Sequence, residues 1–137
     1  MNLEDILEEW ETDSQIDITR LDHEATRIPY LHSKYLKKLG FIKRNLSILR
    51  KKVNELEKER TEYYRGISDK ENYDIKILAK EVPLYLKSDE VMAPIYQKKE
   101  EIEAVEYILT SILQAINNRS FQIKNAIEWS RFQSGLN

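Results

Sequence analysis

The sequence contains no cysteine and only three glycines and three prolines among its 137 residues. Without cysteine it has no disulfide framework, no thiolate nucleophile and no zinc–cysteine site. So few turn residues argue against a β-sandwich or barrel, which needs many tight turns. No apolar run reaches the roughly 18 residues of a membrane-spanning helix, and the acidic segment 1–10 is not a secretory signal. We therefore expect one soluble, cytosolic domain spanning residues 1–137.

The motifs of common enzymes are also missing. The three glycines are isolated, so the chain has no glycine-rich phosphate loop. His23 and His32 stand nine residues apart without neighbouring metal-ligand spacing. Nothing pairs a nucleophile with a base, and we expect neither catalysis nor a cofactor or metal. A small enzyme with a site in segment 66–88 is a second hypothesis, supported only by scattered carboxylates.

Charged residues make up 34 % of the chain, and the hydrophobic share is rich in Ile and Leu, which is typical of long, partly exposed helices. The sequence predicts an all-α fold with a short helix over 2–11, capped by Asn2, and a long helix from about Thr19 to Gly66. Segment 66–88 is an irregular arm, either a short helix or a strand. Another long helix over 89–137 completes a helical hairpin.

Proline 29 allows two interpretations of the first long helix. It either occupies the first turn of a helix capped by Thr26 or kinks a continuous helix. The pattern alone does not decide between them.

Apolar residues recur in heptads along both long helices and predict the faces that pack. In the first helix this seam is Ile28, His32, Tyr35, Leu39, Ile42, Leu46, Leu49, Val53, Leu56, Arg60 and Tyr63. In the second, apolar residues occupy more than one face around 107–116, which indicates either a buried core helix or a subunit interface. The predicted oligomer interface is Ile102, Val105, Leu109, Ile112, Ile116 and Ile123.

Cations recur at every seventh position of the first long helix, opposite its seam. This basic stripe consists of Lys37, Arg44, Lys51, Lys58 and Arg65, and on a helix it extends over about 40 Å. Residues 34–65 carry a net charge of +7 and residues 1–33 a net charge of −7, which the overall −2 conceals. The acidic segment is either simply solvated, or it shields the basic helix or contacts partner proteins. The stripe itself is either a solvated face or a binding surface for a polyanion.

A nucleic acid would use such a stripe through its phosphates, with aromatic rings available to stack on unpaired bases. Tyr64 lies about 100° from the stripe and is the predicted stacking residue, whereas Tyr63 lies on the packed seam. Lys58 and Arg60 point about 200° apart. Arg60 therefore either protrudes where the helices splay near Gly66, or a neighbouring subunit completes the surface.

Several short segments along the chain occur together in a recognisable order. They are Leu3-Glu4-Asp5, Ile16-Asp17, Glu24-Ala25, Ser33-Lys34, Leu36, Ile42-Lys43, Lys58-x-Arg60-x-x-Tyr63-Tyr64-x-Gly66, Ala115-Ile116-x-x-Arg119-x-Phe121-x-Ile123-Lys124, Arg131 and Phe132. With these segments the sequence resembles the UvsY family, the recombination mediators of T-even-type bacteriophages. The resemblance spans nearly the whole chain and is weakest over 67–104.

The resemblance implies a ring-like homo-oligomer, of the hexamer or heptamer class, in the cytoplasm of an infected bacterium. It implies binding of single-stranded DNA together with a phage single-strand-binding protein, and assistance to a phage RecA-like recombinase without hydrolysis of ATP. Lys58 and Arg60 match the family's DNA-contact positions, and the stripe and Tyr64 extend that candidate site. Residues 89–137 would then form the oligomerisation helix. A helical scaffold or chaperone-like oligomer that does not bind DNA is the alternative.

Overall fold

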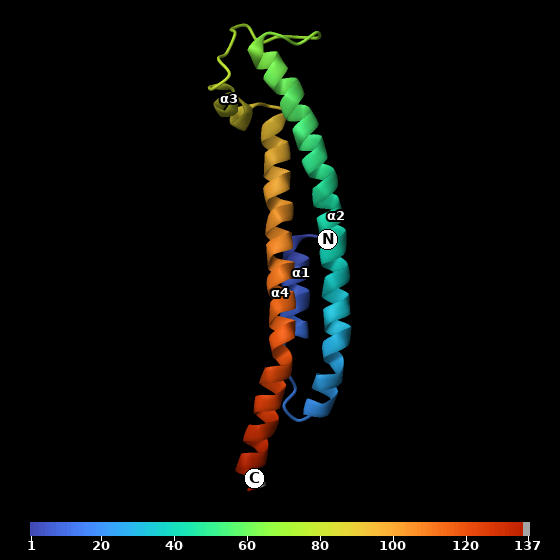
Figure 1. The fold of residues 1–137 in the computed structure, drawn as a ribbon. Coiled ribbons are helices and arrows are strands. Elements are labelled where there is room, and N and C mark those ends of the chain that lie inside the picture. The colour runs from blue at the N-terminus through green and yellow to red at the C-terminus, as the bar shows by residue number, and fades with distance from the viewer. Residues whose placement is uncertain (136–137) are drawn as a thin grey trace. The chain divides into compact units, whose positions relative to one another are not determined.

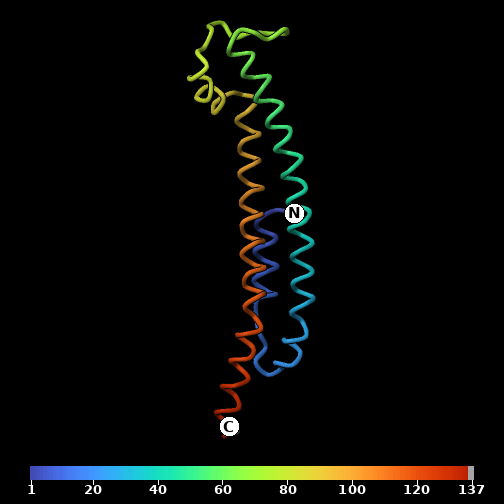
Figure 2. The backbone as a smooth tube through the Cα atoms, in the orientation of Figure 1, coloured from blue at the N-terminus to red at the C-terminus, as the bar shows by residue number. Residues whose placement is uncertain are grey.

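The structure is a computed structural model that describes residues 1–135, and over these residues it contains four helices and no strand. The helices are α1 (Leu3–Asp13), α2 (Leu21–Arg65), α3 (Val82–Ser88) and α4 (Met92–Gln133) (Figures 1 and 2). The predicted all-α class is confirmed. The chain divides into two compact units. We call Met1–Ile42 with Ala104–Asn137 the terminal unit, and Lys43–Glu103 the central unit.

The short helix α1 begins where the sequence predicts. The side chain of Asn2 accepts a hydrogen bond from the backbone N–H of Asp5 at 2.8 Å, so Asn2 caps the helix. At the other end, the N–H of Ser14 donates to the carbonyl of Trp10 at 2.7 Å and closes the last turn. Ile6 faces the interior and is fully buried.

Helix α2 runs without interruption through Pro29. The interpretation in which a helix begins at Pro29 under a Thr26 cap is therefore wrong. The hydroxyl of Thr26 instead donates to the carbonyl of His23 at 2.8 Å. The helix ends at Gly66, whose φ of 73° closes it, while the N–H of Ile67 donates to the carbonyl of Glu62 at 3.1 Å.

In the terminal unit, α1 is fixed to its neighbours by Arg119 of α4. The buried Arg119 guanidinium donates to three successive carbonyls at the C-terminal end of α1, those of Asp13, Ser14 and Gln15, at 3.3, 3.0 and 2.9 Å. It also pairs with Glu24 of α2 at 3.3 Å. One cation thus satisfies the free carbonyls of a helix end and joins three segments of the chain.

In the central unit, segment 66–81 is irregular, and its N–H groups are held by the end of α2. The N–H of Tyr73 donates to the carbonyl of Tyr63 at 3.0 Å, and that of Ile77 donates to the carbonyl of Tyr64 at 2.9 Å. Helix α3 follows, so the short helix, one of the two alternatives for this arm, is the correct one. The buried core of the unit consists of Leu49, Val53, Tyr64, Ile77, Val82, Leu86 and Met92.

Candidate nucleic-acid interface

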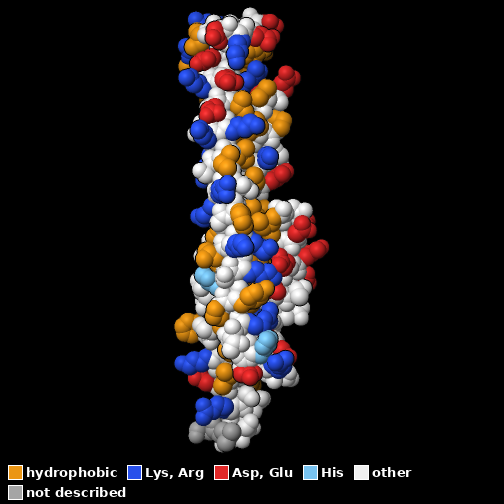
Figure 3. Space-filling model, turned by 90° about the vertical axis from the view of Figure 1, so that its right-hand side faces the viewer, with side chains coloured by type: hydrophobic (Ala, Val, Ile, Leu, Met, Phe, Trp, Pro, Cys, Tyr) orange, Lys and Arg blue, Asp and Glu red, His pale blue; other side chains and the backbone are white. Residues whose placement is uncertain are grey.

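The basic stripe lies on the outer face of α2 over most of its length. Lys37, Arg44, Lys51 and Lys58 are exposed, whereas Arg65 is half-buried. Over residues 1–135, none of the five takes part in an ion pair. Figure 3 shows basic side chains along this side of the molecule, with apolar side chains between them. The four exposed cations are therefore open to an external anion.

Two cations of α2 beside the stripe, Lys34 and Lys38, form ion pairs with acidic residues of α1. Glu9 pairs with Lys34 at 2.7 Å and with Lys38 at 3.1 Å, and Asp13 pairs with Lys34 at 2.6 Å. The hydrogen bond from Lys34 lowers the pKa of Glu9 and outweighs the effect of its partial burial. The acidic N-terminal segment thus neutralises cations beside the stripe, whereas Lys37 has no ion pair within residues 1–135.

Arg60 is turned away from the stripe and held by an acid. Its Nε donates to both carboxylate oxygens of Asp89 at 3.1 Å, and its Nη2 donates to Oδ1 at 2.7 Å. The guanidinium also lies 4.1 Å from the centre of the Tyr63 ring. The hydrogen bonds to Asp89 raise the pKa of Arg60. With 21 % of its side chain exposed, Arg60 does not protrude, so that expectation is wrong.

Tyr64 lies inside the central unit and has only 7 % of its surface exposed. Its hydroxyl donates to Asp89 Oδ1 at 2.7 Å, and its ring packs with those of Tyr63, Tyr73 and Tyr85. Burial, followed by the bond to Asp89, raises the pKa of Tyr64 to about 12. A ring enclosed in this way offers no face to a base. The expectation of a free Tyr64 beside the stripe is therefore contradicted.

Asp89 joins these two residues to the start of α4. Its Oδ2 accepts hydrogen bonds from the N–H groups of Val91 and Met92, both at 3.0 Å, which caps the helix. Burial raises the pKa of Asp89, but the hydrogen bonds from Arg60, Tyr64 and Met92 outweigh that effect and lower it. We call Arg60, Tyr64 and Asp89 the Asp89 lock. It is a structural element, and no pattern in the sequence singled out Asp89 as a member of it.

Lys58 stands beside a groove between the end of α2 and the loop that follows. The groove is lined by Glu55, Lys58, Glu59, Arg60, Glu62, Tyr63, Ser68, Asp69, Lys70 and Glu71. Five of these ten residues are acidic, so the positive electrostatic potential around Lys58 is weaker than that around the other exposed members of the stripe. Lys58 remains accessible to a phosphate, but it is the least favoured of the four.

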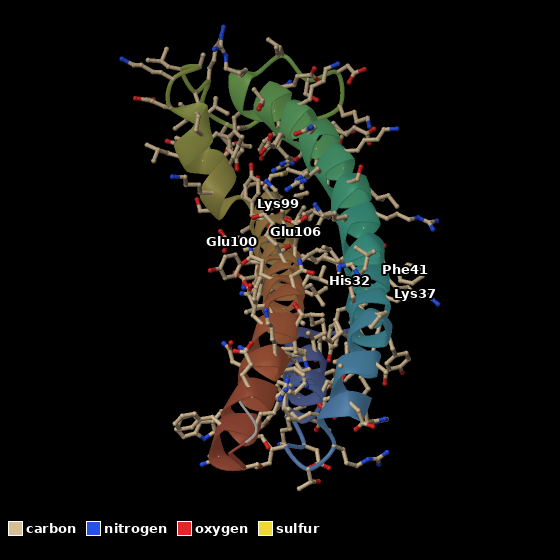
Figure 4. The ribbon with its side chains drawn as sticks, turned by 60° about the horizontal axis from the view of Figure 1, so that its bottom comes forward. His32, Lys37, Phe41, Lys99, Glu100 and Glu106 are labelled. Atoms are coloured by element: carbon tan, nitrogen blue, oxygen red, sulfur yellow. The ribbon has the colours of Figure 1, made fainter. Side chains whose placement is uncertain are left out.

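An aromatic residue that was not predicted from the sequence, Phe41, lies beside the stripe. Phe41 comes four residues after Lys37 and three before Arg44, and half of its surface is exposed. Figure 4 shows Phe41 and Lys37 pointing outward from the same side of α2. The sequence does contain a signal that could have identified it: Phe41 is an aromatic residue between the seam positions Leu39 and Ile42, but it is not itself on the seam.

The predicted oligomer interface is occupied by the chain itself. Ile102 is half-buried against the core of the central unit. The other five residues, Val105, Leu109, Ile112, Ile116 and Ile123, are buried in the terminal unit. Their apolar surface is used within a single copy, so the core-helix alternative fits and these side chains are not available to a second subunit. The exposed apolar residues towards the end of α4 are Phe121, Ile127, Trp129 and Phe132.

Residues 1–135 hold no group of three or more His, Asp or Glu side chains that could bind a metal ion. None of the helices in this range is long and apolar enough to cross a membrane.

Comparison with known proteins relates the whole chain to one family. The family model for the recombination, repair and ssDNA binding protein UvsY matches residues 9–136. The recombination protein uvsY of Enterobacteria phage T4 is 29 % identical over 136 residues, covering 98 % of this chain and 99 % of the relative.

Solved structures agree with this relationship. A crystal structure of the bacteriophage T4 recombination mediator protein UvsY, in lattice type II, superposes with a TM-score of 0.93 at 28 % identity, covering 98 % of both chains. A second crystal form of that protein, lattice type IV, gives a TM-score of 0.91 at 29 % identity, covering 96 % of this chain and 99 % of the other. The chain therefore belongs to the UvsY family of recombination, repair and single-stranded-DNA-binding proteins.

Proposed function

We propose that this protein is a recombination mediator that binds single-stranded DNA along α2. It would help to load a phage RecA-like recombinase onto DNA covered by a phage single-strand-binding protein, in the cytoplasm of the host. It would do so by remodelling the DNA complex without catalysing a reaction. The observation that carries the proposal is the row of exposed, unpaired cations on α2, in a chain that belongs to this family.

The structure changes which residues we assign to DNA. Lys37, Arg44, Lys51 and Lys58 form the proposed contact surface because their charges are free. Arg65 contributes less because it is half-buried. Arg60 and Tyr64 would act indirectly, by holding the end of α2 in place through Asp89.

The proposed assembly is a ring-like homo-oligomer of the hexamer or heptamer class. Its interface would use the exposed apolar residues near the end of α4 instead of the buried ones. Trp129 and Phe132 support this choice because both are exposed and their rings stack at 5.6 Å. A Trp129→Ser/Phe132→Ser variant should show a lower mass by light scattering, and an unchanged mass would exclude this interface.

The test of DNA binding is fluorescence anisotropy with labelled oligo-dT across a salt series. A Lys51→Ala/Arg44→Ala variant removes two proposed phosphate contacts, and Lys98→Ala/Lys124→Ala removes two exposed lysines of α4 as a matched control. Each lost contact should lower the slope of log K against log salt by about 0.7, hence about 1.4 in total. A control variant that weakens binding as much would show that the surface is not specific to α2.

The mediator role needs a second assay. Filament growth of the recombinase on DNA covered by the single-strand-binding protein should show a lag that the wild type shortens. The Lys51→Ala/Arg44→Ala variant should shorten it less. If the wild type binds DNA but leaves the lag unchanged, the protein is a DNA-binding protein and not a mediator.

A further inference from the structure

Phe41 is exposed in the middle of a cationic surface, although it is one of the larger apolar side chains of α2. Its neighbours Leu39 and Ile42 are buried in the seam, whereas half of Phe41 remains in contact with solvent. A carbon built at Gly40, the preceding position, would meet no atom within 4 Å, so this flank of Phe41 is also open. The ring therefore takes no part in the core.

Two of the charges around Phe41, those of Lys37 and Arg44, are not neutralised within residues 1–135, whereas Lys38 is paired with Glu9 of α1. Counted along the helix, Lys37 and Arg44 lie within about 60° of Phe41, one turn to either side. Neither takes part in an ion pair over residues 1–135, in contrast to the nearby Lys34 and Lys38. From Ala25 to Asn54 the sequence has no acidic residue at all.

This charge pattern selects one occupant for the ring. A second copy that docked through the same face would bring the unpaired Lys37 and Arg44 of one copy against those of the other, and their repulsion would oppose the contact. A nucleotide fits instead, because its phosphate carries the opposite charge and its base has an apolar face. An aromatic ring between cations holds unpaired bases without reading their sequence.

We propose that Phe41 is a stacking platform for an unpaired base, whose neighbouring phosphates are bound by Lys37 and Arg44. The proposal rests on the proposed binding of single-stranded DNA and adds a contact that duplex DNA cannot make, since its bases are already stacked. Phe41 thus gives this protein a preference for single strands that the cations alone do not provide.

The test compares oligo-dT with an abasic deoxyribose-phosphate oligomer of the same length. The wild type should bind oligo-dT more tightly than the abasic strand. Phe41→Leu keeps an apolar side chain but removes the ring, and should weaken oligo-dT binding about tenfold. Its affinity for the abasic strand should be unchanged. Tyr107→Leu, at a residue of α4 that is 72 % exposed and lies outside the proposed oligomer interface, is the matched control and should bind both strands as the wild type does.

The outcomes separate this inference from the function on which it rests. Equal affinity of the wild type for both strands, or an unchanged affinity of Phe41→Leu for oligo-dT, would overturn the stacking role while leaving DNA binding intact. Failure of the wild type to bind either strand would overturn the proposed function itself. A lower mass of Phe41→Leu by light scattering would identify Phe41 as a contact between copies, which also overturns the proposal.

Discussion

Replacing Asp89 by alanine should destabilise the protein more than any single change on the basic stripe. The side chain of Asp89 is 1 % exposed and accepts hydrogen bonds from Arg60, Tyr64 and two N–H groups at the start of α4. The substitution leaves the guanidinium without its partner and the helix without its cap. Tyr64 also loses the acceptor for its buried hydroxyl.

The magnitude follows from these lost contacts. Breaking a buried ion pair by removing one partner costs about 3–5 kcal/mol, and we take about 3 because Arg60 retains some access to water. Loss of the cap adds about 1 kcal/mol. The free energy of unfolding should therefore fall by about 4 kcal/mol, a large share of the roughly 5–15 kcal/mol of a typical domain. Asp89→Asn keeps the cap but not the charge, and should lower the free energy of unfolding by about half as much.

Urea unfolding followed by circular dichroism measures this difference, at one fixed protein concentration because assembly also contributes to stability. The control is Glu90→Ala, which removes the adjacent, exposed carboxylate and should change the free energy by less than about 0.5 kcal/mol. A loss below about 1 kcal/mol for Asp89→Ala would refute the lock as a major source of stability.

Three further predictions concern other parts of the fold. Arg119→Ala removes the cation from the end of α1 and should cost about 3 kcal/mol, with faster amide hydrogen exchange in α1 as the specific readout; unchanged exchange there would contradict the role of Arg119. Gly66→Ala should cost about 1 kcal/mol because of the φ of 73°, whereas Gly40→Ala, inside a helix with open space around it, should stabilise by up to about 1 kcal/mol; equal effects in urea unfolding would refute this reasoning. The folded-state pKa values of Asp89 and Asp13 are lowered, so their contribution is complete above the ordinary value of 3.8 and is lost as pH falls through the lower folded values. The free energy of unfolding should be flat between about pH 5 and pH 8 and fall below about pH 4, less steeply in Asp89→Asn, and a flat profile in both proteins across this acidic range would contradict the pKa directions.

The middle of α2 could be predicted from the sequence, and its end could not. Leu46, Leu49 and Val53 lie on the predicted seam and are buried. Beyond them, a straight helix of 3.6 residues per turn drifts by about 20° per heptad away from a seven-residue repeat. Tyr64 lies five full turns after Leu46 and therefore faces the same side of the helix as that buried residue. Tyr64 is thus buried at the position where the heptad pattern had placed Tyr63. The same drift turns Arg65, the last member of the stripe, towards the core.

The candidate site depends on a partner that no local pattern reveals. The structure confirms the predicted exposure of four members of the stripe, Lys37, Arg44, Lys51 and Lys58. Their exposure could be predicted because the spacing of residues along a single helix determines which face they share. The orientation of the Arg60 side chain is set by its hydrogen bonds to Asp89, which stands 29 positions away in sequence. A short-range pattern can place a side chain on a helix face, but it cannot tell which distant acid will meet it. The same holds for the interface residues of α4, whose burial depends on α1 and α2.

The clamp at Arg119 has a consequence for the order in which the protein folds. Helix α1 has only 11 residues and no basic residue in its last turn, and isolated helices of this length are marginal in water. The cation that completes it stands more than 100 positions later in the sequence. In a nascent chain, Lys34 of α2 is already available to Glu9 and Asp13 of α1, but the carbonyls at the end of α1 lack their cation until α4 has been made. Helix α1 should therefore be completed last, and a chain without α4 should leave the end of α1 frayed.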